Sequence, residues 1–113
     1  MALSFVAAGT VATGANPTVA VPAGTAAADL LLLVTCGSAT PTTPTDWTLV
    51  SAEGAGQFIS VYFKYANGSE ASLAVTQAGT STKAVMLAYR GGGAYQVVPA
   101  YTTGTSFNTG NSR

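Results

Sequence analysis

The pattern of apolar and polar residues along the chain predicts short β-strands and no helix. No window repeats apolar residues at the i, i+3, i+4 and i+7 spacing of an amphipathic helix over three turns, because Gly, Pro or Thr interrupts each candidate. Short apolar runs recur between turn-forming residues instead. We expect strands at residues 3–8, 18–21, 30–35, 47–50, 57–65, 72–77, 83–89 and 95–98, with a plain connection over 9–17.

Residues 29–36 contain the longest apolar run, reading Asp-Leu-Leu-Leu-Leu-Val-Thr-Cys. An unbroken run of this kind is typical of a central strand whose side chains are buried on both faces. Residues 84–88 are apolar on both faces as well. Something must pack against each of the two faces of such a strand. The opposing sheet packs against one face, and in so short a chain another molecule is a candidate for the other.

The clearest alternation lies in residues 57–65, and it separates two sets of side chains. The set that we assign to the core is Ile59, Val61, Phe63 and Tyr65. The set that we assign to an amphipathic face, meeting solvent, a neighbouring subunit or a ligand, is Phe58, Ser60, Tyr62 and Lys64.

Seven or eight short strands separated by turn signals predict an all-β, antiparallel β-sandwich. Long Pro-rich connections suit crossovers between two sheets better than the tight hairpins of an up-and-down barrel. The chain has 113 residues, which is enough for one domain, and we place that domain at residues 1–101. Residues 102–113 are mostly Thr, Gly, Ser and Asn and form a polar tail, either flexible or an assembly arm.

Composition indicates a protein that associates with other subunits. Only 7% of the residues are charged, 48% are hydrophobic and the formal net charge is zero, so little charge keeps copies apart. The basic residues are scattered, which argues against a nucleic-acid partner; they are Lys64, Lys83, Arg90 and Arg113. The longest apolar run is too short to span a membrane, and the first residues lack the features of a secretory signal. We therefore expect synthesis in the cytoplasm.

The chain offers little catalytic chemistry. It has no His, and its acids are Asp29, Asp46, Glu53 and Glu70, each beside an expected turn or strand end. A glycosidase-like acid pair and a calcium site at Asp46 and Glu53 are the alternatives to ordinary surface carboxylates. We expect no enzyme activity, no metal and no cofactor. Cys36 is expected to be a small buried hydrophobic residue.

Trp47 has two interpretations. It is either a plug that closes the core at one end of a sheet or a platform on which a sugar stacks, and we favour the plug. The run 91–93 is Gly-Gly-Gly, which we interpret as a hinge or turn.

Several short motifs resemble a jelly-roll β-sandwich module of tailed-phage virion proteins, also met in bacterial surface proteins. The matching segments lie between residues 10 and 92 and are Pro-Ala-Gly at 22–24, Asp-Leu-Leu-Leu at 29–32, Pro-Thr-Asp-Trp-Thr-Leu-Val at 44–50, Val-Tyr-Phe-Lys at 61–64 and Ala-Tyr-Arg-Gly at 88–91. Asp46 stands where the family tends to have Gly. The family module also continues with further strands after the position of Arg90, whereas this chain continues into its polar tail.

The resemblance implies a structural virion protein, most specifically a capsid decoration (cement) protein on the capsid exterior that binds the major capsid protein or other virion subunits. A homo-oligomer, with a trimer favoured, fits that role. The alternative is a carbohydrate-binding module of a phage fibre or bacterial adhesin, with stacking surfaces from Trp47, Tyr62, Tyr89, Tyr95 and Tyr101. Candidate interface or ligand-facing residues are Trp47, Phe58, Tyr62, Lys64, Tyr95, Tyr101 and Phe107.

Overall fold

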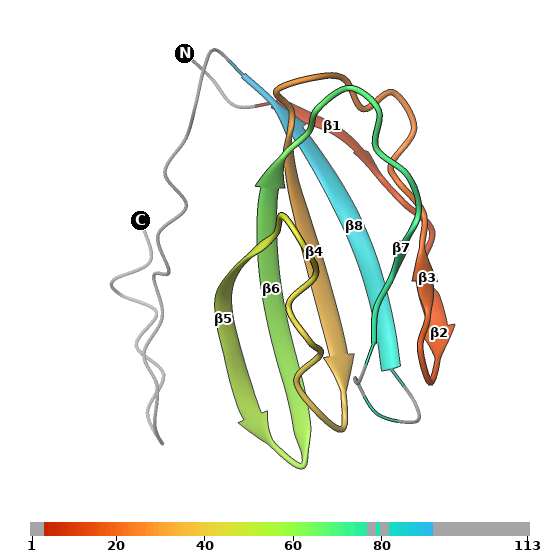
Figure 1. Cartoon of the computed structure of the whole chain (residues 1–113), viewed down its shortest axis with the longest axis vertical. Coiled ribbons are helices and arrows are strands. Elements are labelled where there is room, and N and C mark those ends of the chain that lie inside the picture. The colour runs from red at the N-terminus through yellow and green to blue at the C-terminus, as the bar shows by residue number, and fades with distance from the viewer. Residues whose placement is uncertain (1–3, 77–78, 80–81, 92–113) are drawn as a thin grey trace.

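A computed structural model describes residues 4–76, 79 and 82–91. Every regular element within these residues is a β-strand, and every strand pair is antiparallel (Figure 1). The strands are β1 (Ser4–Ala8), β2 (Ala12–Gly14), β3 (Thr18–Val19), β4 (Leu30–Gly37), β5 (Thr48–Ala55), β6 (Gln57–Tyr65), β7 (Leu73–Ala74) and β8 (Thr82–Arg90). The predicted all-β, antiparallel class is confirmed, whereas the jelly-roll topology stays a prediction.

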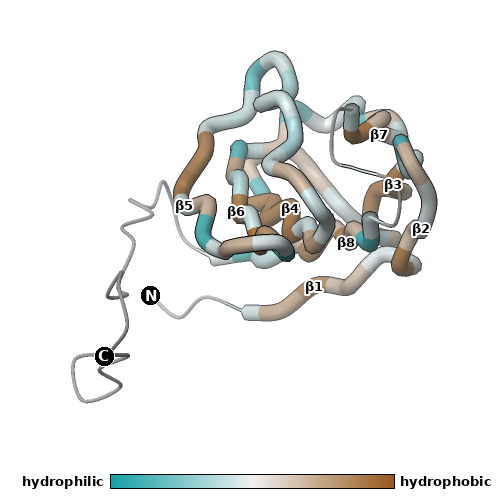
Figure 2. Tube along the Cα trace, turned by 90° about the horizontal axis from the view of Figure 1, so that it is seen from below, coloured by the Kyte–Doolittle hydropathy of each residue, from teal (hydrophilic) through white to brown (hydrophobic). Residues whose placement is uncertain are grey.

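The large sheet has the strand order β1-β8-β4-β6-β5, and β2 pairs with β8 beyond the end of β1. Strand β4 is central, because it pairs with β6 along one side and with β8 along the other. The central position predicted for residues 30–35 is therefore confirmed. Strands β3 and β7 form a separate two-stranded sheet, which lies near the β8 side of the large sheet (Figure 2).

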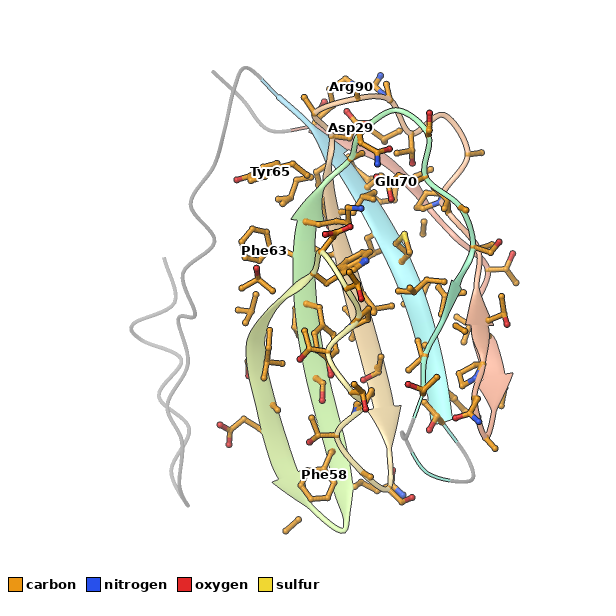
Figure 3. All side chains as sticks on the ribbon, in the orientation of Figure 1. Asp29, Phe58, Phe63, Tyr65, Glu70 and Arg90 are labelled. Carbon is orange, nitrogen blue, oxygen red and sulfur yellow. The ribbon has the colours of Figure 1, made fainter. Side chains whose placement is uncertain are left out.

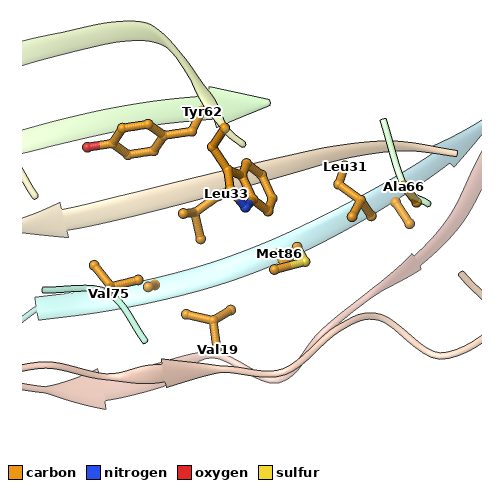
Figure 4. Close-up of a cluster of buried hydrophobic side chains, with 10 residues drawn as sticks. Val19, Leu31, Leu33, Tyr62, Ala66, Val75 and Met86 are labelled. Atoms are coloured by element: carbon orange, nitrogen blue, oxygen red, sulfur yellow. The ribbon is translucent and has the colours of Figure 1, made fainter. Parts of the chain in front are cut away.

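The core lies between one face of the large sheet, which we call the inner face, and a cover made of β3, β7 and the connecting loops (Figure 4). Leu31 and Leu33 from β4 are fully buried there beside Met86 from β8. The other members of this cluster are Val19, Trp47, Tyr62, Ala66, Val75, Ala84 and Ala88. Full burial of one such aliphatic side chain stabilises the fold by about 1.5–3 kcal/mol, so this cluster favours the packing of the cover on the large sheet.

The structure reverses the predicted faces of β6. Tyr62 and Ser60 are fully buried in the inner face, whereas Ile59 is 55% exposed on the opposite face. The Tyr62 hydroxyl donates a hydrogen bond to the Pro41 carbonyl oxygen at 3.0 Å, so the phenol is buried with its polar atom satisfied. Alternation defines two faces but does not say which one the cover will lie on, and the cover here lies over the tyrosine.

Several strand predictions also need correction. The strands predicted at 18–21 and 72–77 are shorter in the structure, as β3 and β7 show. Residues 12–14, predicted as part of a connection, form β2 along β8. Strand β5, predicted to end at Val50, runs on to Ala55 because residues 51–55 pair with β6 although they contain no apolar run. An irregular register between Leu49 and Ser51 places Val50 as an extra residue, a β-bulge. The predicted strand at 95–98 and the tail at 102–113 lie outside the described residues.

Candidate functional site

The face of the large sheet opposite the core, which we call the outer face, carries mostly apolar side chains. Its members are Phe5 from β1; Leu30, Leu32, Val34 and Cys36 from β4; Ser51 and Glu53 from β5; Ile59, Val61, Phe63 and Tyr65 from β6; and Lys83, Val85, Leu87 and Tyr89 from β8, together with Thr48 at the start of β5. Phe5 and Ile59 are 58% and 55% exposed. Leu30 is buried among its neighbours, at 5% exposed, and the other apolar members of this face are half-buried. The described part of the chain therefore leaves this face partly open to solvent.

The strand register arranges these side chains in rows that cross the sheet. One row runs Val85, Val34, Val61 and Ser51 across β8, β4, β6 and β5. The next runs Leu87, Leu32, Phe63 and Thr48. In both rows three apolar side chains lie side by side and the residue on the edge strand β5 carries a hydroxyl. The outer face is thus a continuous apolar surface with a polar margin, which is the type of surface found at protein–protein contacts.

Aromatic pairs stand at the end of the outer face where β4 begins. The Phe5 and Tyr89 rings meet edge to face, with centroids 5.5 Å apart and planes at 63°. The Phe63 and Tyr65 rings do the same at 6.0 Å and 81° (Figure 3). These contacts orient the four rings and so give this end of the outer face a defined shape.

Two hollows lie beside these rows. A hollow of about 220 Å³ is lined by Val11, Val34, Thr35, Cys36, Lys83, Ala84 and Val85. Val11 is 56% exposed at its rim. The second hollow, of about 400 Å³, lies where β6 extends past the start of β5, and it is lined by Asp46, Thr48, Phe63, Lys64, Tyr65 and Asn67. It combines aromatic rings with a carboxylate, a hydroxyl and an amide.

Asp29 and Arg90 form an ion pair at the same end of the sheet (Figure 3). The Arg90 guanidinium donates from Nε to Oδ1 and from Nη2 to Oδ2, both at 2.8 Å, and Oδ2 also accepts from the Ala26 amide at 2.8 Å. Nη2 also donates to the Gly24 carbonyl oxygen at 2.8 Å. The hydrogen bonds from Arg90 hold the pKa of Asp29 below its ordinary value of 3.8, although burial acts in the opposite direction. The pair joins β8 to the turn that precedes β4.

A second ion pair fixes Lys64. Its Nζ lies 3.0 Å from Glu70 Oε1 and 6.0 Å from the centre of the Trp47 ring. Glu70 Oε2 accepts a hydrogen bond from the Asn67 amide at 2.8 Å. Lys64 is therefore held by contacts within the chain, whereas the sequence suggested that it faces a partner or ligand.

Trp47 is 9% exposed and belongs to the core cluster, which confirms the plug interpretation. Asp46 before it has φ of +73°, in the left-handed region that favours Gly, so a Gly at this position would adopt the same conformation without steric cost. The Trp47 amide closes this turn on the Pro44 carbonyl oxygen at 3.1 Å.

The candidate interface residues from the sequence are not brought together. Trp47 and Tyr62 are in the core, where burial raises the pKa of the Tyr62 phenol above its ordinary value of 10.0. The nearby Ser60 hydroxyl acts on this pKa in the opposite direction. Phe58 is half-buried at the start of β6. The remaining candidates, Tyr95, Tyr101 and Phe107, lie outside the described residues.

The residues that do form an open surface were assigned to the core from the sequence. Ile59, Val61 and Phe63 are the main examples. Their signal was present in the apolar character of both faces in residues 30–34 and 84–88, which requires a second cover. Cys36 is half-buried on the outer face, so the prediction of a buried thiol is wrong.

The acids do not assemble a site in the described part of the chain. Asp29 and Glu70 are each in an ion pair, and Asp46 and Glu53 are exposed. Within the described residues no three His, Cys, Asp or Glu side chains lie close enough together to hold a metal ion. No helix able to cross a membrane occurs in the ranges that the structure describes.

Comparison of the chain with protein-family models, with curated proteins and with solved structures gives no match. The geometry of the chain itself therefore carries the functional argument.

Proposed function

We propose that the chain is a structural subunit that works by association rather than by catalysis. The observation that carries this proposal is the open outer face, whose central rows are apolar across three neighbouring strands. Leaving such a surface in water costs free energy, about 25 cal/mol for each Å² of apolar area that a partner would otherwise cover. A subunit that remains unassociated would gain nothing from such an apolar surface.

The specific role proposed is that of a capsid decoration protein of a tailed phage, bound to the capsid exterior through contacts with coat subunits. The motif resemblance and the charge-poor composition support it. The ion pair of Asp29 and Arg90 adds a further point, because these two residues belong to two of the resembling motifs and meet in space. A contact of more than about 1,000 Å² would stabilise a shell by mass action.

The test is reconstitution of shells that lack this chain. Adding the wild-type chain is expected to raise the temperature at which shells break, and to raise their resistance to chelators. The control variant is Thr43→Asp, which introduces a charge at an exposed position in the loop that covers the core and is expected to protect the shells as the wild-type chain does. Shells whose resistance does not change on addition of the wild-type chain, at saturating concentration, would rule out the cementing role.

A second candidate, carbohydrate recognition as in a fibre or adhesin module, is favoured by the hollow of about 400 Å³ at Asp46, Phe63, Tyr65 and Asn67. Aromatic faces beside carboxylate and amide groups suit sugar rings, which present apolar C–H faces and polar rims. Glycan-array binding that Phe63→Ala removes and Phe58→Ala leaves intact would support this role. An empty array would count against it.

A further inference from the structure

One row of the outer face carries a basic and an acidic residue on opposite sides of two apolar ones. Lys83 on β8 pairs with Cys36 on β4, Cys36 pairs with Ile59 on β6, and Ile59 pairs with Glu53 on β5. Lys83 and Glu53 are both exposed. From β8 to β5 the row therefore reads basic, apolar, apolar and acidic, and Thr13 on β2 continues it beyond Lys83.

Neither charge of this row is neutralised within the described part of the chain. The ion pairs found there are Asp29 with Arg90 and Lys64 with Glu70. They leave Lys83 and Glu53 without an oppositely charged neighbour, although both lie on the apolar outer face. Two unmatched charges of opposite sign on one apolar surface are the pattern expected where a partner supplies the missing charges.

The two charged residues are placed symmetrically about the line midway between β4 and β6. Neighbouring strands are about 4.8 Å apart, so Lys83 and Glu53 lie at equal distances of about 7 Å on either side of this line. Consider two sheets stacked with their outer faces together. A two-fold axis between them and parallel to the strands exchanges the two sides of the line, and so places Lys83 of each copy over Glu53 of the other.

The alternative two-fold axis, at right angles to the strands, gives the opposite result. It would place β8 over β8 and β5 over β5, and the like charges would meet. The charge pattern thus selects one of the two face-to-face arrangements.

The same axis matches the other rows. It places Val34 over Val61 of the second copy and Leu32 over Phe63, so apolar side chains meet at the centre. It places Val85 and Leu87 over the Ser51 and Thr48 positions, at the polar margin. An apolar centre inside a polar rim is the usual anatomy of a protein interface, and sheets that stack in this way keep their mean strand directions within about 30°.

The size of the face also fits. The four overlapping strand positions, β8, β4, β6 and β5, and eight residues along each strand give roughly 500 Å² in projection. The accessible area of a corrugated surface is larger than its projection, and one side of a stable interface is about 800 Å². A second copy therefore covers this face at the scale that a stable dimer needs.

We propose that two copies of the chain associate through their outer faces, about a two-fold axis that runs parallel to β4 and β6 and pairs Lys83 of each copy with Glu53 of the other. This inference deepens the assembly role proposed above by naming the occupant of the open face. Coat subunits would then contact other surfaces of the dimer.

The test is a charge exchange read by analytical ultracentrifugation of the full chain. The wild-type chain is expected to sediment as a dimer. Lys83→Glu or Glu53→Lys alone places like charges together twice in each dimer, so each is expected to raise the dissociation constant roughly tenfold or more. The double variant restores opposite charges and is expected to return the constant to within about threefold of wild type. Both positions are exposed, so the fold is preserved.

The single thiol gives a second measurement. Cys36 lies in the same row, half a strand spacing from the axis, and stacked sheets are about 10 Å apart. A bismaleimide of about that span is expected to cross-link the wild-type and double-variant dimers, and to cross-link either single variant much less. A chain that sediments as a monomer or a trimer overturns the proposal. A dimer whose dissociation constant is unchanged by both single variants overturns it as well. A monomer that still protects shells retains the decoration role alone, and a dimer that fails to protect them retains this inference alone.

Discussion

Arg90 holds the buried carboxylate of Asp29 through two parallel hydrogen bonds of 2.8 Å, across 61 positions of sequence. Arginine is suited to this geometry because its planar fork meets both carboxylate oxygens at once. Arg90→Lys keeps the charge but loses the fork, and Arg90→Ala leaves the carboxylate with the Ala26 amide alone. We expect the urea midpoint of unfolding to fall in the order wild type, Lys, Ala. Equal midpoints for all three would show that the fork adds nothing.

The same pair predicts the response to acid. The pKa of Asp29 is lowered in the folded chain, so its contribution to stability is complete above the unfolded value of about 3.9 and is lost as the pH falls through the folded value. The free energy of unfolding should therefore drop below about pH 4. Asp29→Asn should be less stable at neutral pH and should lose less on acidification. Urea titrations followed by the fluorescence of the buried Trp47 provide the measurement, and Glu53→Gln provides the control.

Two buried hydroxyls are expected to be dispensable. Thr35 Oγ1 and Ser60 Oγ face the core from paired positions on β4 and β6, and neither finds a hydrogen-bond partner among the described residues. Replacing an unpaired buried hydroxyl by a methyl group removes a desolvation cost, so Thr35→Val should stabilise the fold by about 1 kcal/mol. Thr82→Val is the matched control, because the Thr82 hydroxyl donates to the Gly79 carbonyl oxygen at 3.2 Å. Urea unfolding should show opposite signs for the two variants.

The face assignment of β6 can be tested with neighbouring residues. Tyr62→Phe removes the hydrogen bond to Pro41 and leaves a buried carbonyl oxygen with one partner fewer, so we expect a loss of about 1–2 kcal/mol. Ile59→Ser alters a side chain that is 55% exposed, and within the monomer it should cost less than about 0.5 kcal/mol. If Ile59→Ser, measured in dilute solution, lowers the free energy of unfolding more than Tyr62→Phe does, then Ile59 and not Tyr62 faces the core.

Most of the fold could be predicted from the sequence because the longer strands each have a local pattern of apolar and polar residues. The strand predicted at 57–65 has the observed bounds, and the run at 30–35 is the central strand that its unbroken apolar character indicated. The three-residue strand β2 was not predictable, because only its pairing with β8 makes it a strand.

The candidate site was harder to predict than the fold, for a different reason. Alternation distinguishes two faces, but the choice of the covered face depends on where residues 38–47 fold back, and Tyr62 and Phe63 are equally suited to a core by size. The pairing of Asp29 with Arg90, and of Lys83 with the row that ends at Glu53, follows from register between distant segments. No local pattern carries that information. The sequence did indicate that the outer face of the central strands needs something packed against it.

The bulge at Val50 has a consequence for how far assembly can proceed. An unprotected edge strand recruits further strands without limit and so favours fibres. Here one edge carries that bulge, and the other is divided between β1 and β2, so neither edge presents a regular ladder along its full length. Growth through edges is disfavoured, and a two-fold contact through faces closes on itself. A chain with almost no repulsive charge can in this way form a finite particle rather than a filament.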